Sequence, residues 1–288
     1  MNNGIVQQKP KFSVAITTKG YQTLINNTLG DPERAKRFVA SITSAVAVSP
    51  ALQDCDAGSI LACALLGESL SLSPSPQLGH YYLVPFNNKD GSKKAQFVLG
   101  YKGYMQLAIR SGQLKKLLAI EIKQGELNYF DPINEVIDCV IIEDWDKREA
   151  APTIGYYAMF ETLNGYRKAM YWSKKQMLTH ADKYSPAFSA SVYEKIQRGE
   201  IPDKDMWKYS SFWYKDFDAM AKKTMLRQLL TKGGCPMSTE LITALERDSV
   251  IAEIDRTNDD IITMPEDVAQ LTQPEAETVV EAVNLNDI

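Results

Sequence analysis

The stretch that decides the fold runs from Gln96 to Gly112 and reads QFVLGYKGYMQLAIRSG. It opens with apolar residues typical of a strand, breaks at Gly100, and continues from about Tyr101 with the spacing of a helix. Three polar side chains recur at every fourth position and so share one face of that helix: Lys102, Gln106 and Arg110. A strand, a glycine and a helix edged by two cations offer donors to a chain of phosphates, although the same pattern also describes an ordinary solvated face.

A chain of 288 residues is long enough for one large domain or two small ones with a sizeable core. Hydrophobic residues make up 44% of it and charged residues 24%, values typical of globular proteins in water. No apolar run approaches the roughly 20 residues of a membrane helix, and the first 11 residues lack the apolar segment of a signal peptide. We therefore expect a protein of the cytoplasm that has no membrane partner.

The charge of the chain is unevenly distributed. Residues 246–288 hold 12 acidic and 2 basic side chains, a net charge of −10, in a chain whose total is −4. The preceding residues therefore carry a net charge of +6. Few apolar residues, together with Pro265 and Pro274, predict that residues 246–288 form a disordered acidic tail on a basic body. We expect this tail to temper nucleic-acid binding or to provide a docking site for partners.

Residues 1–72 predict a helical lobe. Amphipathic helices are expected over 11–29, where Gly30 ends the pattern, and over 32–48, where Pro32 begins the next. A third helix, over 57–69, is apolar on nearly all sides and must be buried. Either it is central to its own chain or the lobe meets another subunit, and the second interpretation predicts that the lobe mediates assembly.

Residues 73–245 predict a core of mixed strands and helices. Strands are expected over 80–86, 95–99, 117–123, 136–142, 154–161 and 166–172. The last two flank Asn164-Gly165, a pair typical of a hairpin turn. Helices are expected from a cap at Ser173 to about 180, near 192–198 and over 238–247. Lys93 and Lys94 lie near the tip of the first hairpin, where they are either solvated or contact DNA or a neighbouring subunit.

The second informative stretch is WYKDFDAMAKKTMLRQLL, residues 213–230, which predicts one long helix. Apolar side chains cover two of its sides, so the helix should be held between layers. Four cations lie on the narrow faces between those apolar sides: Lys215, Lys222, Lys223 and Arg227. Charges on a mostly buried helix are costly unless they are paired or face a ligand, and Asp216 alone does not neutralise all four.

Several kinds of chemistry find no support in the sequence. There is no GxxxxGK[ST] loop for ATP, no GxSxG elbow and no metal-binding spacing around His80 or His180, so we expect no cofactor. Pairs of aspartates are also typical ligands of magnesium, so a magnesium-dependent nuclease is a weaker alternative function. The four cysteines show no CxxC spacing, which favours buried reduced thiols over disulfides or metal ligands.

Three motifs resemble the RecT family of phage and prophage single-strand annealing proteins. They are LSLSPSPQLGHYYLVPF, then FVLGYKGYMQLAIRSG, then WYKDFDAMAKKTMLRQLL, and they stand in the order and at the spacing of the family. The resemblance covers roughly residues 1–245. The acidic tail is the part that family members share least.

The resemblance implies an α+β fold similar to that of lambda Red beta, in which a curved antiparallel sheet is crossed by a long helix and DNA lies in a basic groove. It also implies ATP-independent annealing of single-stranded DNA to a complementary strand during homologous recombination. The implied assemblies are homo-oligomeric rings or helical filaments. The implied partners are an exonuclease and a host single-stranded DNA-binding protein, in the cytoplasm of a bacterial host.

Annealing requires that the phosphates are held while the pairing edges of the bases stay free, which calls for backbone contacts from Lys and Arg. The predicted contacts are therefore the polar face of the helix that follows Gly100 and the four cations of the 213–230 helix. Tyr101, Tyr104 and Trp213 either support base faces or pack in the core. The alternative function is a single-stranded DNA-binding protein that protects DNA without annealing it.

Overall fold

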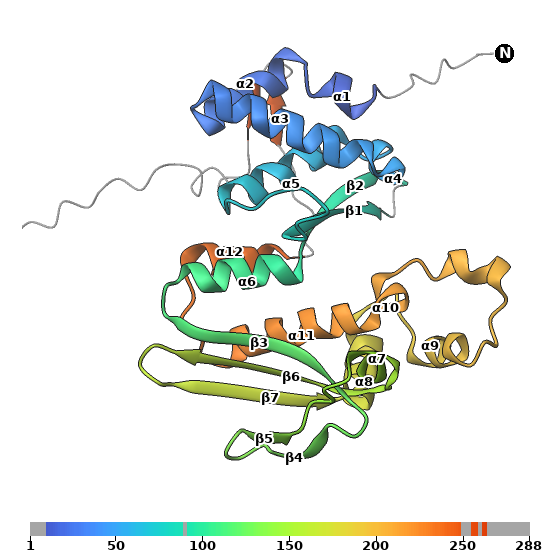
Figure 1. The fold of residues 1–288 in the computed structure, drawn as a ribbon. Helices are drawn as coiled ribbons and strands as arrows, with labels where there is room; N and C mark the ends of the chain where they lie inside the picture. The colour runs from blue at the N-terminus through green and yellow to red at the C-terminus, as the bar shows by residue number, and fades with distance from the viewer. Residues whose placement is uncertain (1–9, 89–90, 249–254, 259–260, 264–288) are drawn as a thin grey trace, which may run out of the picture. The chain divides into compact units, whose positions relative to one another are not determined.

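The computed structural model describes residues 10–88, 91–248, 255–258 and 261–263 (Figure 1). The chain forms two compact units. The first, here the helical unit, comprises the described residues within 1–75, 83–98 and 249–288, and the second, here the sheet unit, comprises residues 76–82 and 99–248. The chain therefore leaves and re-enters each unit, and most of the first hairpin belongs with the N-terminal helices. In the described part of the chain, no helix has the length and apolar character to cross a membrane.

The helical unit is built from α1 (Phe12–Ala15), α2 (Lys19–Leu29), α3 (Pro32–Ala47), α4 (Pro50–Gln53) and α5 (Ala57–Ser69). The signals at the end of α2 act as predicted: Gly30 adopts a left-handed conformation with φ of 66°, and the Asp31 carboxylate accepts a hydrogen bond from the Glu33 N–H at 3.0 Å. The single helix predicted over 11–29 was wrong. The hydroxyls of Thr17 and Thr18 bond to preceding carbonyl groups and the chain turns there before α2 begins.

Helix α5 is buried on every side, as its composition predicts. Ten consecutive residues, Gly58 to Gly67, are buried, and the side chain of Ser59 ties the helix to the hairpin by accepting the Ala95 N–H at 2.8 Å. The burial is achieved within one chain. Of the two interpretations of this apolar helix, the structure supports the central one, so its composition does not by itself require a neighbouring subunit.

The hairpin consists of β1 (Tyr81–Asn87) and β2 (Lys93–Leu99), close to the strands predicted over 80–86 and 95–99. Two further strands, β8 (Asp255–Asn258) and β9 (Ile261–Thr263), pair with each other, and β9 lies against α2. Both lie in the segment predicted to be a disordered tail. The prediction of disorder for the acidic residues beyond Thr263 lies outside the described residues.

The sheet unit contains a three-stranded antiparallel sheet in the order β3 (Leu114–Lys123), β6 (Thr153–Thr162), β7 (Arg167–Ser173). Its central strand β6 is buried on both faces. Tyr157 and Met159 pack on one face beside the β4 (Leu127–Asp131) and β5 (Val136–Cys139) hairpin. Tyr156 and Phe160 point to the other face, which α11 (Phe217–Lys232) covers (Figure 1). The predicted class, mixed helices and antiparallel strands, is therefore confirmed, while the curvature of the sheet stays a prediction.

The remaining elements of the sheet unit are α6 (Tyr101–Arg110), α7 (Trp145–Ala150), α8 (Lys174–Tyr184), α9 (Ala190–Gln197), η1 (Asp203–Lys208), α10 (Phe212–Lys215) and α12 (Thr239–Arg247). Ser173 caps α8 as predicted, in a reciprocal capping box with Gln176. Strand β4 and helix α7 were not predicted. Among the described residues no cysteine forms a disulfide, and Cys55, Cys63 and Cys235 are buried.

The long helix predicted over 213–230 is divided in two. Asp216 has φ of −148°, which ends α10, and its side chain accepts the Ala219 N–H at 3.0 Å, which caps α11. A short acidic side chain at this position satisfies a backbone donor better outside a helix than within one. The apolar pattern continues through the break because Trp213 and Phe217 pack against each other, with ring centroids 5.2 Å apart.

Candidate nucleic-acid interface

A close approach between two backbone segments determines where α6 begins. The Gly100 N–H donates to the His80 carbonyl oxygen at 2.8 Å. A Cβ atom added to Gly100 would lie 2.1 Å from the Gly79 oxygen, and one added to Gly103 would lie 2.0 Å from the His80 oxygen. No other residue fits at these two positions without moving the backbone. The glycines of the GYKG motif therefore hold α6 against the segment before β1.

The predicted polar face of α6 is exposed to solvent. Lys102, Gln106 and Arg110 all lie on the outside of the helix, whereas Tyr104 and Leu107 are buried. Lys102 makes no ion pair with any described residue. Burial, followed by the charges of Arg110 and Lys102, lowers the pKa of His80, so both cations act on the same region of the surface. The structure thus brings together the three residues that their spacing placed on one face.

The three candidate aromatic residues are less accessible. Tyr104 is fully buried and donates its hydroxyl to the Asp248 carboxylate at 2.6 Å. Trp213 is 7% exposed and packs between Phe188 and Phe217. Tyr101 is half-buried. Burial favours the core-packing interpretation for Tyr104 and Trp213, because neither ring has an open face on which a base can stack.

Two of the four cations predicted on α11 converge on one buried carboxylate. Asp248, which directly follows α12, has no exposed side-chain surface. Lys223 Nζ lies 3.5 Å from its Oδ1, and Arg227 Nη1 lies 3.0 Å from its Oδ2. The same carboxylate accepts the Leu99 N–H at 2.9 Å and the Tyr104 hydroxyl. Burial lowers the pKa of Lys223, although Asp248 opposes that shift.

The other two cations of this region differ from each other. Lys222 forms an ion pair with Glu121 of β3 at 3.0 Å, and both side chains are partly buried. Burial alone would raise the pKa of Glu121, but hydrogen bonds from Lys222 and the backbone outweigh it and the pKa is lowered. Lys215 belongs to α10 and is exposed, with its Nζ 5.9 Å from the Phe212 ring. Of these two, only Lys215 faces solvent without an ion pair to a described residue.

The two hairpin lysines lie in the helical unit, at the start of β2. Lys93 forms an exposed ion pair with Asp54 at 2.8 Å, and its carbonyl oxygen accepts the Asp56 N–H. Lys94 is half-buried. The Lys93 side chain is therefore engaged within its own chain.

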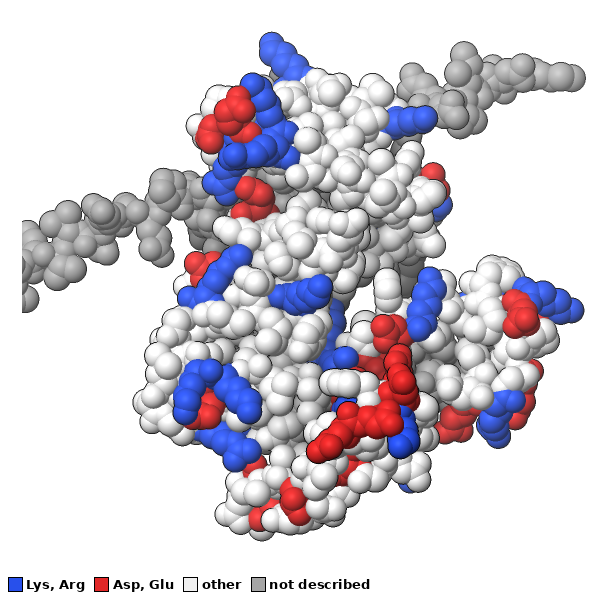
Figure 2. All heavy atoms as spheres, viewed as in Figure 1, with Lys and Arg blue, Asp and Glu red and all other residues white. Residues whose placement is uncertain are grey.

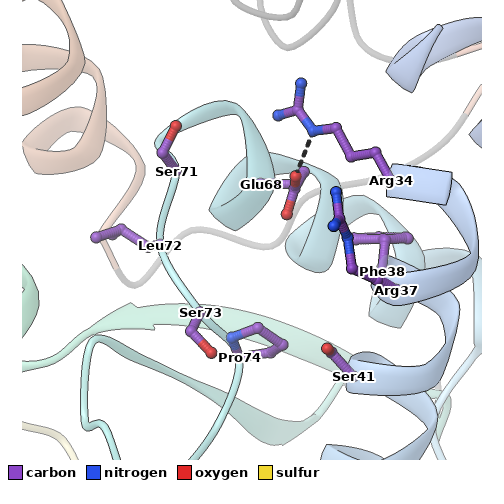
Figure 3. Close-up of a pocket in the computed structure, with 9 residues that line it drawn as sticks. All are labelled: Arg34, Arg37, Phe38, Ser41, Glu68, Ser71, Leu72, Ser73 and Pro74. Atoms are coloured by element: carbon purple, nitrogen blue, oxygen red, sulfur yellow. Dashed lines mark hydrogen bonds and ion pairs between the residues drawn. The ribbon is translucent and has the colours of Figure 1, made fainter. Parts of the chain in front are cut away.

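A pocket of about 360 Å³ opens in the helical unit, between α3 and the segment that follows α5 (Figure 3). Two arginines line this pocket. Arg34 Nε donates to Glu68 Oε1 at 2.7 Å, so the charge of Arg34 is neutralised. Arg37 contributes the second guanidinium, and Phe38 and Leu72 supply apolar surface. Leu72 lies within the motif LSLSPSPQLGHYYLVPF, but the sequence predicts no binding role for the residues of this pocket.

The main feature that sequence reasoning missed is Asp248. It was placed in the acidic tail, but Glu246 and Arg247 belong to α12 and Asp248 is buried. The surplus of cations on α11 signals that a counter-ion is needed, but no pattern shows which acidic residue supplies it. On the face shown in Figure 2, basic and acidic side chains are interspersed over the sheet unit. Net charge alone therefore does not locate the binding surface.

Comparison with known proteins identifies the class of protein to which this chain belongs. The model of the RecT family matches residues 36–262. The chain is a member of the RecT family, a family of single-strand annealing proteins of DNA recombination. This confirms the resemblance inferred from the three motifs.

Two relatives illustrate the relationship. The chain is 38% identical over 228 residues to the uncharacterized protein YqaK of Bacillus subtilis, an alignment that covers 79% of this chain and 69% of the relative. It is 29% identical over 217 residues to Protein RecT of Escherichia coli, with 74% of this chain and 71% of the relative covered. Membership of the family supports a role in recombination or annealing and implies single-stranded DNA binding and oligomerisation.

Proposed function

We propose that this protein anneals complementary single strands of DNA without ATP, as part of homologous recombination in a bacterial cell. The observation that carries the proposal is the match of the RecT family model to residues 36–262. The exposed polar face of α6 supports it physically, because phosphate contacts from Lys and Arg hold a strand without reading its bases. The pairing edges then stay free for the second strand.

The proposed phosphate contacts are the residues that combine a positive or polar side chain with solvent exposure: Lys102, Gln106 and Arg110 of α6 and Lys215 of α10. Arg227 joins them because its side chain is 41% exposed despite its ion pair. Lys222 is a weaker candidate, since it must first leave Glu121. Contacts from Lys93 or Lys94 to DNA or to a neighbouring subunit, and support of a base by Tyr101, stay predictions.

Assembly and partners follow from the same proposal. Many copies bound along one strand, as rings or helical filaments, would keep that strand extended while a second strand is tested for complementarity. An exonuclease would supply the single strand by degrading its complement, and a host single-stranded DNA-binding protein would occupy the strand beforehand. Both partners belong to the proposal and rest on family membership.

The test is the renaturation rate of two complementary labelled oligonucleotides, followed by fluorescence quenching with and without the protein. An annealing protein increases this rate without ATP. A protein that only protects single strands slows renaturation, and that result would reject the proposal. Incubating the labelled DNA with magnesium or manganese, followed by electrophoresis, tests the nuclease alternative, for which shortened strands are the diagnostic product.

A further inference from the structure

The carboxylate of Asp248 joins four segments of the sheet unit. It accepts hydrogen bonds from the last residue of β2, Leu99, and from Tyr104 of α6, and it pairs with Lys223 and Arg227 of α11. Asp248 itself follows the last residue of α12. A buried carboxylate with two neutral donors and two cations is fully satisfied. The cluster of these side chains carries one surplus positive charge.

The two cations in this cluster are not equivalent. The Lys223 side chain is 13% exposed and its Nζ lies 6.0 Å from the centre of the Tyr104 ring, so it faces the interior. The Arg227 side chain is 41% exposed. Its Nη1 donates to Asp248 Oδ2 at 3.0 Å, and its guanidinium also interacts with the hydroxyl of Tyr104. Arg227 is therefore the cation of this cluster that is accessible to a phosphate in solvent.

Two neighbours, the Asp248 carboxylate and the Tyr104 hydroxyl, restrict the orientation of the Arg227 guanidinium, and its remaining N–H groups match the spacing of phosphate oxygens. Fixing that orientation before binding reduces the side-chain entropy that is given up when a phosphate is bound. Helix α11 packs against α6, the helix that carries Lys102 and Arg110. The guanidinium of Arg227 therefore belongs to the same unit as the exposed Lys102 and Arg110.

We propose that Asp248 is a positioning residue for DNA binding: it neutralises Lys223 inside the protein and orients Arg227 toward one phosphate of the bound single strand. This inference rests on the proposed function and refines it, because it gives Lys223, a phosphate contact predicted from the sequence, a place in the interior of the protein. It also assigns a role to a residue that the charge pattern placed in the acidic tail.

The test uses full-length protein and the salt dependence of binding to a labelled single-stranded oligonucleotide, measured by fluorescence anisotropy. For each phosphate of a single strand that a variant no longer neutralises, the slope of log affinity against log salt becomes shallower by about 0.7. Arg227→Gln is expected to reduce the slope by about that amount. Lys223→Met, which removes the buried charge at similar length, is expected to keep the wild-type slope.

The decisive variant is Asp248→Asn combined with Lys223→Met, which leaves no unpaired buried lysine and so avoids the main cause of unfolding. It should fold, as judged by circular dichroism, yet show the reduced slope of Arg227→Gln. Adding Arg227→Gln to this double variant should cause no further decrease, because Arg227 is already misplaced for the phosphate once Asp248 no longer orients it.

Three results would overturn the inference: a reduced slope for Lys223→Met, a wild-type slope for Arg227→Gln, or a wild-type slope for the folded double variant. A double variant that did not fold would also overturn it, since Asp248 would then have a structural role only. Failure of the proposed function looks different, because wild-type protein itself would then show no salt-dependent binding or would not accelerate annealing.

Discussion

Helices α6 and α11 carry cations at similar helical spacing but in different surroundings. On α6, Lys102 and Arg110 project from a helix whose buried side faces the rest of the sheet unit. On α11, Lys222 and Lys223 are partly or largely buried and are paired with Glu121 and with Asp248. Both helices had been predicted to bind DNA on the same kind of evidence.

The difference shows what a charge pattern reports. The spacing of cations determines which face of a helix they share. Whether that face meets water, a carboxylate or a ligand depends on the segments packed against it. For α11, one of those segments is the end of α12, which lies beyond the motif in the sequence. The following predictions test how far the two helices differ.

The largest expected effect is on stability. Asp248→Ala leaves Lys223 and Arg227 without their counter-ion, and removing one partner of a buried ion pair costs about 3–5 kcal/mol. Asp54→Ala is the matched control, since Asp54 also forms an ion pair, with Lys93 at 2.8 Å, but is exposed. Urea unfolding followed by circular dichroism should show a large decrease in stability for the first variant and no measurable change for the second. Equal decreases would contradict the contrast between buried and exposed pairs.

The next effect is on DNA affinity. Replacing both Lys102 and Arg110 with Ala removes two exposed cations from α6 without opening the core, so the fold should persist while the affinity for single-stranded DNA decreases. If each cation neutralises one phosphate, the salt slope falls by about 1.4. Fluorescence anisotropy at several salt concentrations measures both quantities.

The matched control for α6 is the replacement of Lys175 and Lys195 with Ala. These residues are exposed on α8 and α9, and replacing them removes the same net charge. If the control variant binds DNA as weakly as the α6 variant, the effect comes from net charge alone. The α6 face would then not be a specific contact surface.

The smallest effect concerns the acidic C-terminal segment. Truncation after Thr263 removes six acidic and no basic residues but keeps Asp248, β8 and β9. Binding to single-stranded DNA should tighten modestly, and most at low salt, because a tethered polyanion competes with phosphates and salt screens that competition. Annealing should persist. Weaker binding after truncation would show that this segment contributes to binding and does not compete with it.

Local patterns predicted most helices and strands of this protein. Gly30 and Asp31 mark a helix boundary, and Ser173 begins a helix in a capping box, because their signals act within a few residues. The apolar composition of 57–69 predicted a helix that is buried on all sides. These features depend on the chain next to each residue and on little else.

Predictions failed where two local preferences competed or where a distant segment decided the outcome. At Asp216, the apolar pattern favoured a continuous helix, but a carboxylate able to cap a new helix divided it. Strand β4 escaped prediction because its five residues, LNYFD, are too few and too mixed to show a clear period. Tyr104 and Trp213 were uncertain because aromatic rings suit both a core and a base-stacking surface.

The sequence by itself determined the family, the glycine-bounded start of α6, the placement of Lys102, Gln106 and Arg110 on one face, and the need for counter-ions on α11. These properties follow from periodicity, turn chemistry and charge balance, all of which can be read along the chain. Only the tertiary structure decided that Asp248 is the counter-ion, that Lys223 faces the interior and that Arg227 remains partly exposed. The reason is that the energy of a charge depends on its burial and its nearest opposite charge, and both are set by residues that are distant in the sequence.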